Sequence, residues 1–454
     1  LYEPAIRRAA GLGNAPDKPD PDHYANRFAH CDVLVIGAGP AGLAAALAAC
    51  ETGARVILAD EQPVPGGRLR FEADARIEGK SGWDWAEETV ARLAARDNVR
   101  VLTRTTGFGY YAQNMIGLVE RVTDHLANPD PNAPRERLWQ VRAKRVVLAT
   151  GAIERHMVFP DNDRPGIMLA SSARTYLNHF GVAVGNRIAV YAAEDSAYAA
   201  AIDLKKHGVG IAAIIDSRAA PESPAVEEAR ALGIDVLAGH AVIGTDGRLR
   251  VRRVHVAPIS GGPHREFQVD ALLTSSGWTP AVHLFSQSRG KLAFDEATQR
   301  FLPGLYVQDA VSVGSCNGTF DLASSVNEAF DAGAKVAKEA GFRKPRARQM
   351  EASSGTPWSI GMAGASPGVE PGTSKMAFVD FKNDVTAKDI RQAVREGMRS
   401  IEHVKRFTTT GMATDQGKTS NLHGLAIASQ MLGKPIPEVG LTTFSPPYTP
   451  VTFG

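Results

Sequence analysis

Residues 31–61 read CDVLVIGAGPAGLAAALAACETGARVILADE, and this stretch decides the fold. A short apolar run, residues 33–36, predicts a buried parallel strand, and the Ala- and Leu-rich residues after the glycines predict a helix. A second apolar run, residues 55–59, ends in two acidic residues. The order of strand, glycine turn, helix, strand and acid, at this spacing, is typical of a dinucleotide-binding βαβ unit.

Each part of the glycine turn has a physical role in binding a dinucleotide. Gly37 makes the tight turn, Gly39 lets the backbone approach a pyrophosphate, and Gly42 lets the helix pack closely on the strand. The free N–H groups at the start of the helix hold the phosphates, and an acid, Asp60 or Glu61, accepts hydrogen bonds from the ribose hydroxyls. The alternative is a glycine turn that only packs, but the flanking strand, helix and acids favour a nucleotide site.

The composition limits the class of protein and its partners. A length of 454 residues suggests about three domains, and 44% hydrophobic with 22% charged residues is typical of a soluble globular protein. No apolar stretch is long enough to span a bilayer, and the start has no signal-peptide pattern. The net charge of +2 gives no reason to expect nucleic acid or a membrane surface as a partner.

The cysteines and the chain ends are also informative. Cys31, Cys50 and Cys316 lie far apart, which excludes the usual zinc and iron–sulfur spacings and a local redox disulfide. We therefore expect no metal, and a reducing cytoplasm is the simplest setting. The chain begins at Leu1 rather than Met and ends in a Pro-rich run, so we expect it to be a piece of a longer protein.

The whole chain divides into seven segments by composition and periodicity. We predict an α/β fold with an N-terminal arm over residues 1–30, the first part of a dinucleotide-binding domain over 31–151, a second, degenerate unit over 152–270, a return to the first domain over 271–342, a linker over 343–375, a small helical module over 376–435, and the start of a further, missing domain over 436–454.

Three further stretches place backbone or charge beside the first glycine turn. The Gly-Gly-Arg run at 66–68 brings flexible backbone and a cation, with a surface turn as the alternative. Residues 143–151 predict a buried strand that ends in Ala-Thr-Gly and closes over the cofactor. The loop at 314–321, GSCNGTFD, lies between a strand and a helix and predicts a second phosphate- or ring-contacting edge.

The second α/β unit lacks a glycine turn. Its opening strand, residues 187–191, runs into Glu194 and Asp195, where such a turn would be expected. Two carboxylates at this place oppose the binding of a phosphate. We therefore expect this unit to keep the fold without the ligand.

The helical module contains a loop with phosphate-binding chemistry. Residues 386–389, TAKD, match a capping box with Asp in place of Glu, and apolar residues at helical spacing follow. The loop at 407–421, FTTTGMATDQGKTSN, resembles the end of a nucleotide-hydrolase phosphate loop, but five residues rather than four separate its glycines, and a helix precedes it. Its hydroxyls and Lys418 suit a monophosphate at the start of the next helix, with self-capping turns as the alternative.

Taken together, these stretches resemble the α subunit of heterotetrameric sarcosine oxidase. The resembling features are GAGPAG with the two acids, GGR, AAEDSAY at 192–198, NGTFDLA at 317–323 and, above all, AFVDFKNDVTAKDI followed by HVKRFTTTGMATDQGKTSN. The resemblance covers nearly the whole chain and implies a two-dinucleotide-binding-domain fold of the pyridine nucleotide-disulfide oxidoreductase type. The chain would be the middle portion of such a subunit, without its small N-terminal domain and its C-terminal folate-binding domain.

The resemblance also implies an activity, cofactors and partners. The complex demethylates sarcosine oxidatively to glycine, reduces O2 to H2O2 and passes the one-carbon unit to tetrahydrofolate. NAD would lie at the first glycine turn without turnover, a β subunit would carry the substrate-oxidising FAD, covalent FMN would lie between α and β, and other small subunits would complete the hetero-oligomer. We expect no catalytic acid–base pair in this chain.

The cofactor-binding residues that follow from the motifs and the resemblance form two groups. The dinucleotide group is Gly37, Gly39, Pro40, Ala41, Gly42, Asp60, Glu61, Gln62, Gly67, Arg68, Leu69, Thr106 (near the adenine), Ala149, Thr150, Gly151 and Gly318. The group for the FMN phosphate is Arg406, Thr408, Thr409, Lys418, Thr419 and Ser420.

Other functions stay open at the level of the sequence. From the residues alone FAD is the better choice for the first site. A self-sufficient oxidoreductase would bind FAD there and NAD(P)H at the second site. The degenerate second turn and the missing redox cysteines weigh against such an oxidoreductase. A non-catalytic assembly subunit with a structural dinucleotide is a third hypothesis. A related amino-acid dehydrogenase branch carries an iron–sulfur cluster in the helical module. The absence of cysteine from residues 317–454 excludes that cluster here.

Overall fold

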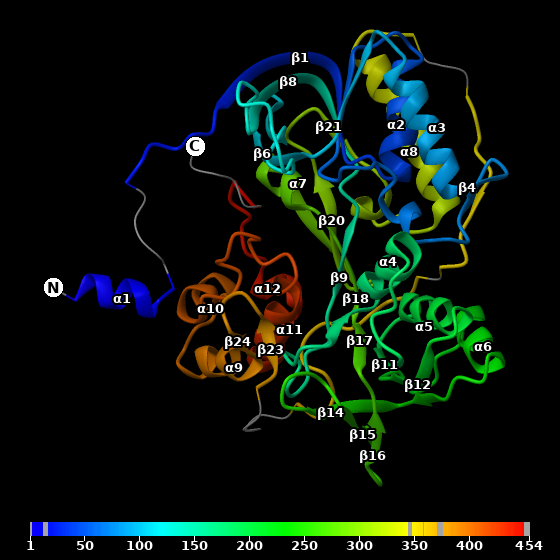
Figure 1. The fold of residues 1–454 in the computed structure, drawn as a ribbon, viewed down its shortest axis with the longest axis vertical. Helices are drawn as coiled ribbons and strands as arrows, with labels where there is room; N and C mark the ends of the chain where they lie inside the picture. Colours follow the sequence, from blue (N-terminus) through cyan, green and yellow to red (C-terminus); the bar gives the residue numbers. More distant parts are fainter. Residues whose placement is uncertain (1, 12–16, 344–346, 357, 370–375, 449–454) are drawn as a thin grey trace.

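The computed structural model describes residues 2–11, 17–343, 347–356, 358–369 and 376–448 (Figure 1). Two α/β units, each with a largely parallel sheet, make up most of it, and a helical module follows at the C-terminal end. The α/β class and the helical module predicted from the sequence are therefore confirmed. No helix in these described ranges combines the length and the apolar character that crossing a membrane requires.

The first sheet carries the glycine turn. Its strand order is β5, β2, β1, β8, β7, β6, and a further strand, β21, pairs with the last residues of β8. Pairing is parallel from β5 to β8 and to β21, and antiparallel from β8 through β7 to β6. The strands are β1 Tyr24–Ile36, β2 Val56–Ala59, β5 Val99–Leu102, β6 Thr105–Tyr111, β7 Met115–Arg121, β8 Glu136–Leu148 and β21 Ala310–Ser312.

The N-terminal arm predicted over residues 1–30 is wrong in part. A short exposed helix, α1 (Glu3–Ala9), begins the chain, and β1 already begins at Tyr24. The first half of β1 is only partly buried, yet it pairs residue by residue with the equally long β8. The strand therefore extends beyond the apolar run because ladder hydrogen bonds satisfy its backbone without burial of its side chains.

Three helices pack on one face of the first sheet (Figure 1): α2 (Pro40–Cys50), α3 (Gly82–Ala94) and α8 (Leu322–Glu339). Every residue of α2 is buried, which explains why its sequence is apolar all round instead of amphipathic. A Cβ atom on Gly333 of α8 would overlap the carbonyl oxygen of Ala45 in α2. Small residues thus let α2 and α8 lie close together on the sheet.

The second sheet is entirely parallel, with the order β10, β17, β11, β12, β13. The predicted return to the first domain at residue 271 is therefore wrong, because β17 is a central strand of this second sheet. All five residues of β17 are buried, as expected of a strand covered on both faces. The elements are β10 Ile167–Leu169, α4 Ala170–Phe180, β11 Arg187–Ala192, α5 Ser196–Lys206, β12 Gly210–Asp216, α6 Pro224–Ala231, β13 Val236–Ala238 and β17 Ala271–Ser275, with an antiparallel sheet of β14 His240–Asp246, β15 Arg253–Pro258 and β16 Arg265–Gln268 beside them.

Two crossing strands join the units. Strand β9 (Ala152–Arg155) leaves the first unit, β18 (Gly277–Pro280) returns to it, and the two pair antiparallel. The chain re-enters the first sheet at β21, after the short elements α7 His283–Gln287, β19 Lys291–Asp295 and β20 Arg300–Leu305.

The linker predicted over residues 343–375 is wrong for the part that the structure describes. Strand β22 (Ala352–Ser353) pairs with β3 (Arg76–Ile77), which pairs with β4 (Lys80–Ser81). A Cβ on Gly361 would overlap the carbonyl oxygen of Ser276, so this segment lies directly against the crossing strands. The Gly and Ser residues that indicate a flexible linker also allow this close approach. We call residues 352–356 and 358–362 the strap.

The helical module packs on the second unit. Its apolar side chains, among them Ile390 and Leu425, belong to the same buried cluster as Tyr191 of β11. The predicted capping box is confirmed, with Thr386 and Asp389 exchanging both hydrogen bonds. We predicted that residues 436–454 are the start of a missing domain. In the structure the short helix α12 of this segment packs on the module, and residues 449–454 lie outside the described residues. The elements are β23 Phe378–Asp380, β24 Val385–Thr386, α9 Ala387–Arg395, α10 Ile401–Thr408, α11 Asn421–Leu432 and α12 Ile436–Val439.

Candidate functional site

The glycine turn connects the end of β1 to the start of α2, and its three glycines have different surroundings. Gly37 has φ +100°, and a Cβ there would overlap the carbonyl oxygen of Ala149. A Cβ on Gly42 would overlap the carbonyl oxygen of Gly37. By contrast, the nearest atom to a Cβ on Gly39 is the Cα of Gly67, at 3.8 Å. Packing therefore requires Gly37 and Gly42, whereas a Cβ on Gly39 would meet one atom at an ordinary contact distance, so a pyrophosphate could approach the backbone there.

The Gly-Gly-Arg run folds back onto this turn. The N–H of Gly66 donates to the carbonyl of Ala38 at 2.8 Å, and the short helix η1 (Gly67–Arg70) follows. A Cβ on Gly67 would come within 2.8 Å of the Cα of Gly39. The first residue after the two glycines, Arg68, is thereby placed beside the turn.

Arg68 is a largely buried cation whose two Nη atoms lack acceptors among the described residues. Its side chain is only 11% exposed, and both Nη atoms have no hydrogen-bond partner among the described residues. Its Nε lies 3.8 Å from Oε1 of Glu72, and its guanidinium lies 5.2 Å from the ring centre of Trp358 in the strap. Buried polar groups are almost always hydrogen-bonded, so these two donors indicate an anionic or polar ligand at this place.

The two acids after β2 have separate roles. The carboxylate of Asp60 accepts the N–H of Ala38 at 2.5 Å and that of Gln62 at 2.8 Å. Burial raises the pKa of Asp60, and these two hydrogen bonds oppose the rise. Asp60 therefore holds the turn, and the exposed Glu61 is the acid that remains for a ribose. The N–H of Thr105, the first residue of β6, donates to the carbonyl of Asp60 at 2.7 Å, and Thr106 is the next residue of that strand.

The two other segments predicted to contact the cofactor, residues 149–151 and the loop at 314–321, lie beside the turn. Ala149 donates its N–H to Ile36 at 2.8 Å, and the Thr150 hydroxyl donates to the carbonyl of Ala281 at 2.7 Å. The short helix η2 (Gly314–Asn317) packs closely against the start of α2: a Cβ on Gly314 would come within 2.8 Å of the Cβ of Ala41. The structure thus brings the predicted dinucleotide group together, except that the side chain of Leu69 packs in the core. Pro40, Gly151 and Gly318 lie within these same segments.

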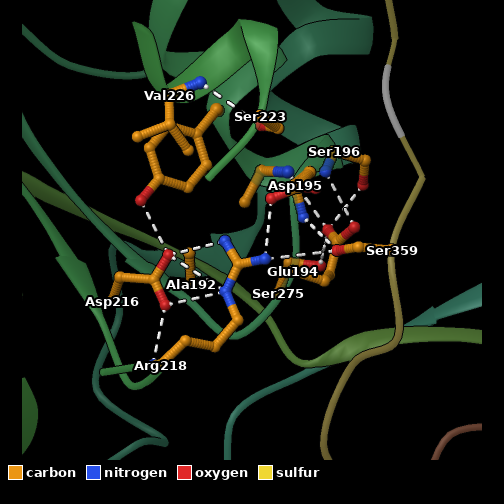
Figure 2. A network of polar contacts seen from close by, with 12 residues as sticks. Ala192, Glu194, Asp195, Ser196, Asp216, Arg218, Ser223, Val226, Ser275 and Ser359 are labelled. Atoms are coloured by element: carbon orange, nitrogen blue, oxygen red, sulfur yellow. Dashed lines mark hydrogen bonds and ion pairs between the residues drawn. The ribbon is translucent and has the colours of Figure 1, made fainter. Parts of the chain in front are cut away.

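The second turn, between β11 and α5, is filled by the chain itself (Figure 2). Glu194 accepts the N–H groups of Ser196 and Ala197 at 2.7 and 3.1 Å, and these are the first amides of α5. The Ser275 hydroxyl also donates to it, at 2.9 Å. An internal carboxylate thus takes the donors that a phosphate would use at a helix start. This arrangement supports the prediction that the second unit binds no phosphate there.

An arginine that the sequence analysis did not identify completes this network. Arg218, after β12, donates to Asp195 and to Asp216, each at 2.7 Å (Figure 2). The Ser359 hydroxyl of the strap accepts the N–H of Asp195 at 2.9 Å and lies 3.3 Å from Nη1 of Arg218. Arg218 could have been noticed as a cation two residues after the end of a strand, but no sequence signal pointed to Ser359.

A second buried acid lies on the crossing strand β9. Glu154 accepts the N–H of Ser171 at 2.9 Å and its hydroxyl at 2.5 Å. Burial raises the pKa of Glu154 to about 7, and the charge of Glu194 adds to the rise. The junction of the two units therefore holds a carboxyl group that titrates near neutral pH.

Glu154→Gln is expected to flatten the pH dependence of stability. Because the pKa of Glu154 is about 7 in the folded chain and 4.5 is its ordinary value, the folded state binds more protons between these values, and stability falls as the pH rises from 5 to 7. The loss is on the order of 3 kcal/mol. Urea unfolding at pH 5 and 8 measures it, with Glu87→Gln, an exposed glutamate, as the control. Equal slopes for Glu154→Gln and the unaltered chain would contradict the assignment.

The loop of the helical module has most of its hydroxyls already bonded. Thr408 and Thr409 donate to backbone carbonyls at 2.8 and 2.6 Å. The carboxylate of Asp380 accepts the N–H of Gly411 at 2.7 Å and lies 3.4 Å from the hydroxyl of Ser420. For these residues the geometry favours the self-capping alternative over a phosphate.

Lys418 is placed differently from the other residues of this loop. Its Nζ lies 4.4 Å from the ring centre of Tyr448, and burial lowers its pKa while the charge of Glu61 opposes the change. Arg406 is exposed on α10, and Thr419 is half-buried beside Lys418. The structure therefore does not gather the six predicted phosphate residues around one point, and the FMN site stays a prediction.

The cysteines are unsuited to redox chemistry in this fold. All three are free and buried, and burial raises the thiol pKa of Cys31 to about 12 and that of Cys50 to about 11. Within the described ranges, no group of His, Cys, Asp and Glu could hold a metal ion. Burial thus keeps the thiols of Cys31 and Cys50 protonated and poorly reactive.

Comparisons with known proteins agree with this geometry. Residues 31–326 match the family model described as pyridine nucleotide-disulphide oxidoreductase, and residues 374–454 match the sarcosine oxidase A3 domain. Among solved structures, the chain is similar to L-proline dehydrogenase from P. horikoshii, with a TM-score of 0.70 and 25% identity over 94% of this chain and 79% of that one. It also shares the fold of T. acidophilum thioredoxin reductase, with a TM-score of 0.53 and 19% identity over 68% of this chain and 99% of that one.

The curated relatives extend the resemblance to the whole chain. The alpha subunit of sarcosine oxidase from Rhizobium meliloti (strain 1021) is 43% identical over 100% of this chain and 45% of its own length. The protein of the same name from Corynebacterium sp. (strain P-1) is 41% identical over 98% of this chain and 47% of its own length. The resemblance to sarcosine oxidase α subunits inferred from the sequence is thus confirmed, and the chain spans about half the length of these relatives.

Proposed function

The chain belongs to the pyridine nucleotide-disulphide oxidoreductase family, and we propose that it is the nucleotide-binding portion of a sarcosine oxidase α subunit. The observation that carries the proposal is the lack of close packing against Gly39 beside Arg68, whose two buried Nη atoms have no hydrogen-bond partner among the described residues, in a chain that is similar to such subunits over its whole length. The complete protein would demethylate sarcosine to glycine, reduce O2 to H2O2 and pass the one-carbon unit to tetrahydrofolate, in a hetero-oligomer with a β subunit that carries FAD.

In this proposal the first site holds NAD. Gly39 and the start of α2 would bind the pyrophosphate, Arg68 would supply charge-assisted hydrogen bonds, and Glu61 would accept the ribose hydroxyls. The carboxylate of Glu61 would repel a 2′-phosphate, so NAD is favoured over NADP. FAD satisfies the same adenosine contacts and stays the alternative. NAD, when bound, is a hydride carrier; the chain's part in the reaction is to hold it.

We further propose that the module contributes to an FMN site at a subunit interface, with Lys418 as its cation. No acid–base pair for sarcosine is assigned to this chain, since Glu154 and Glu194 are both buried and bonded to serines. Membership of a related amino-acid dehydrogenase complex is the second candidate. An opine oxidase subunit of Rhizobium meliloti (strain 1021) is 25% identical over 93% of this chain and 97% of its own length, a weaker similarity than that of the sarcosine oxidase subunits. The cytoplasmic setting stays a prediction from the cysteines.

Nucleotide analysis tests the proposal. Acid denaturation of the purified protein followed by mass spectrometry is expected to release about one NAD per α chain, because the first site is the one that retains phosphate-binding geometry. Adding NADH to the undenatured protein is expected to leave any flavin oxidised. Release of FAD from a preparation without the β subunit, with reduction of that FAD by NADH, would favour the self-sufficient oxidoreductase instead.

A further inference from the structure

Two adjacent residues of the strap contact the two strand-to-helix turns, one residue at each turn. On the side of the second turn, Ser359 contacts Asp195 and Arg218. On the side of the first turn, Trp358 lies against Arg68. The strap therefore links the filled site to the site that we expect to hold a ligand.

Trp358 is part of a cluster of aromatic rings and arginines beside the first turn. Its ring centre lies 5.1 Å from that of Phe320 and 5.2 Å from that of Trp278, in tilted and edge-to-face arrangements. The guanidinium of Arg300 lies 4.3 Å from the ring centre of Phe320, and its Nη2 donates to the carbonyl of Ser359 at 3.1 Å. Cations held over aromatic faces stabilise such a cluster by about 0.5–2 kcal/mol for each contact. Trp358 is thus held in place from several sides.

The strap is also anchored to the first unit and to α4. The Ser354 hydroxyl donates to Glu72 at 2.9 Å, and the N–H of Gly355 donates to Asp74 at 2.5 Å. The hydroxyl of Thr356 accepts a hydrogen bond from the buried Arg174 at 2.6 Å. Beyond Ser359, the N–H of Met362 donates to the carbonyl of Ser276 at 2.8 Å. Anchors on both sides of Trp358 therefore oppose its displacement.

We propose that the strap retains the dinucleotide of the first site, with Trp358 as the wall against which the end distal to the adenine lies. This inference rests on the proposed function. Glu61 would bind the ribose of the adenosine and Gly39 the pyrophosphate. Trp358 packs on Arg68, the cation that would bind the phosphates, so we place the other end of the ligand on the Trp358 side of Arg68. Release of the ligand requires Trp358 to move, and the anchors make that movement slow. The dinucleotide then behaves as a permanent part of the protein and does not exchange as a co-substrate would.

Isotope exchange in the purified full-length protein tests this role. The protein is incubated with excess isotopically labelled NAD, passed through a desalting column, denatured and analysed by mass for labelled and unlabelled NAD. Wild type is expected to keep its unlabelled NAD for hours. Trp358→Ala is expected to exchange about tenfold faster or more, since loss of stacking and packing worth about 1.4 kcal/mol is a factor of ten. Trp358→Phe, which keeps an aromatic face, is the matched control and is expected to stay close to wild type.

The outcomes separate this inference from the proposed function. Stoichiometric NAD that exchanges at the same rate in wild type and in folded Trp358→Ala would overturn the strap's role and leave the proposed function standing. Wild-type protein without any dinucleotide would overturn both. Ser359→Ala provides a second variant that removes only one hydroxyl; its exchange is expected to be faster than wild type, and an unchanged rate in both Ser359→Ala and Trp358→Ala would count against the proposal.

Discussion

Gly39→Val is expected to empty the first nucleotide site while the chain stays folded. The backbone of Gly39 has φ −72° and ψ −176°, which a residue with a side chain adopts without strain, and the nearest atom to a Cβ is 3.8 Å away. A valine side chain would instead project into the space where the pyrophosphate must contact the backbone. We expect bound dinucleotide to fall from about one per chain to a few per cent, measured by mass after denaturation, with a change in unfolding free energy within about 1 kcal/mol.

Gly42→Val is the matched control on the same turn. Its side chain would overlap the carbonyl oxygen of Gly37, so the turn itself must distort and the chain should lose several kcal/mol of stability. We therefore expect Gly39→Val to be folded but without bound dinucleotide, and Gly42→Val to be poorly folded. Full nucleotide content in folded Gly39→Val would show that the ligand does not cross this turn.

Arg68→Met is expected to weaken dinucleotide binding and to destabilise the empty chain. The Nε of Arg68 lies 3.8 Å from the fully buried carboxylate of Glu72. Methionine removes this partner and leaves the carboxylate less well compensated, so the unfolding free energy of the empty chain should fall by about 1–3 kcal/mol. With the ligand present, the same change removes charge-assisted hydrogen bonds worth about 1.5–3 kcal/mol, so affinity should fall about 10- to 100-fold.

Urea unfolding with and without NAD measures both effects of Arg68→Met, because a ligand that binds only the folded state adds to its stability. Arg68→Lys is the control that keeps the charge but loses the planar array of donors. We expect it to bind more weakly than wild type and more tightly than Arg68→Met. An Arg68→Met chain that binds NAD as tightly as wild type would mean that Arg68 is a structural residue only.

The sequence was most informative where the determinants are local. The order of apolar run, glycines, helix and acids around Gly39 is a local pattern, and each part constrains its neighbour through backbone geometry. The capping box at Thr386 is local in the same way. These features could be predicted because no distant residue decides them.

Long-range pairing decided the features that the sequence did not reveal. Strand β17 follows β16 in the chain, yet it pairs between β10 and β11, and its apolar run would suit either sheet. The strap has the composition of a linker, and its long-range contacts with Asp195 and Arg68 bring it to both turns. Likewise, Asp60 and Glu61 are adjacent and chemically similar, and only the hydrogen bond to Ala38 separates their roles.

The neighbourhood of Glu61 and Lys418 has a thermodynamic consequence. The charge of Glu61 acts on Lys418 across the junction of the first unit and the module. A ligand that engages Glu61 changes the field at Lys418, and an anion held by Lys418 changes the field at Glu61. Because linkage between two sites is reciprocal, each occupant would alter the affinity of the other by the same factor if both proposed sites bind their ligands. Measuring the affinity for inorganic phosphate in NAD-loaded and NAD-free protein would then reveal the coupling between the first turn and the Lys418 loop.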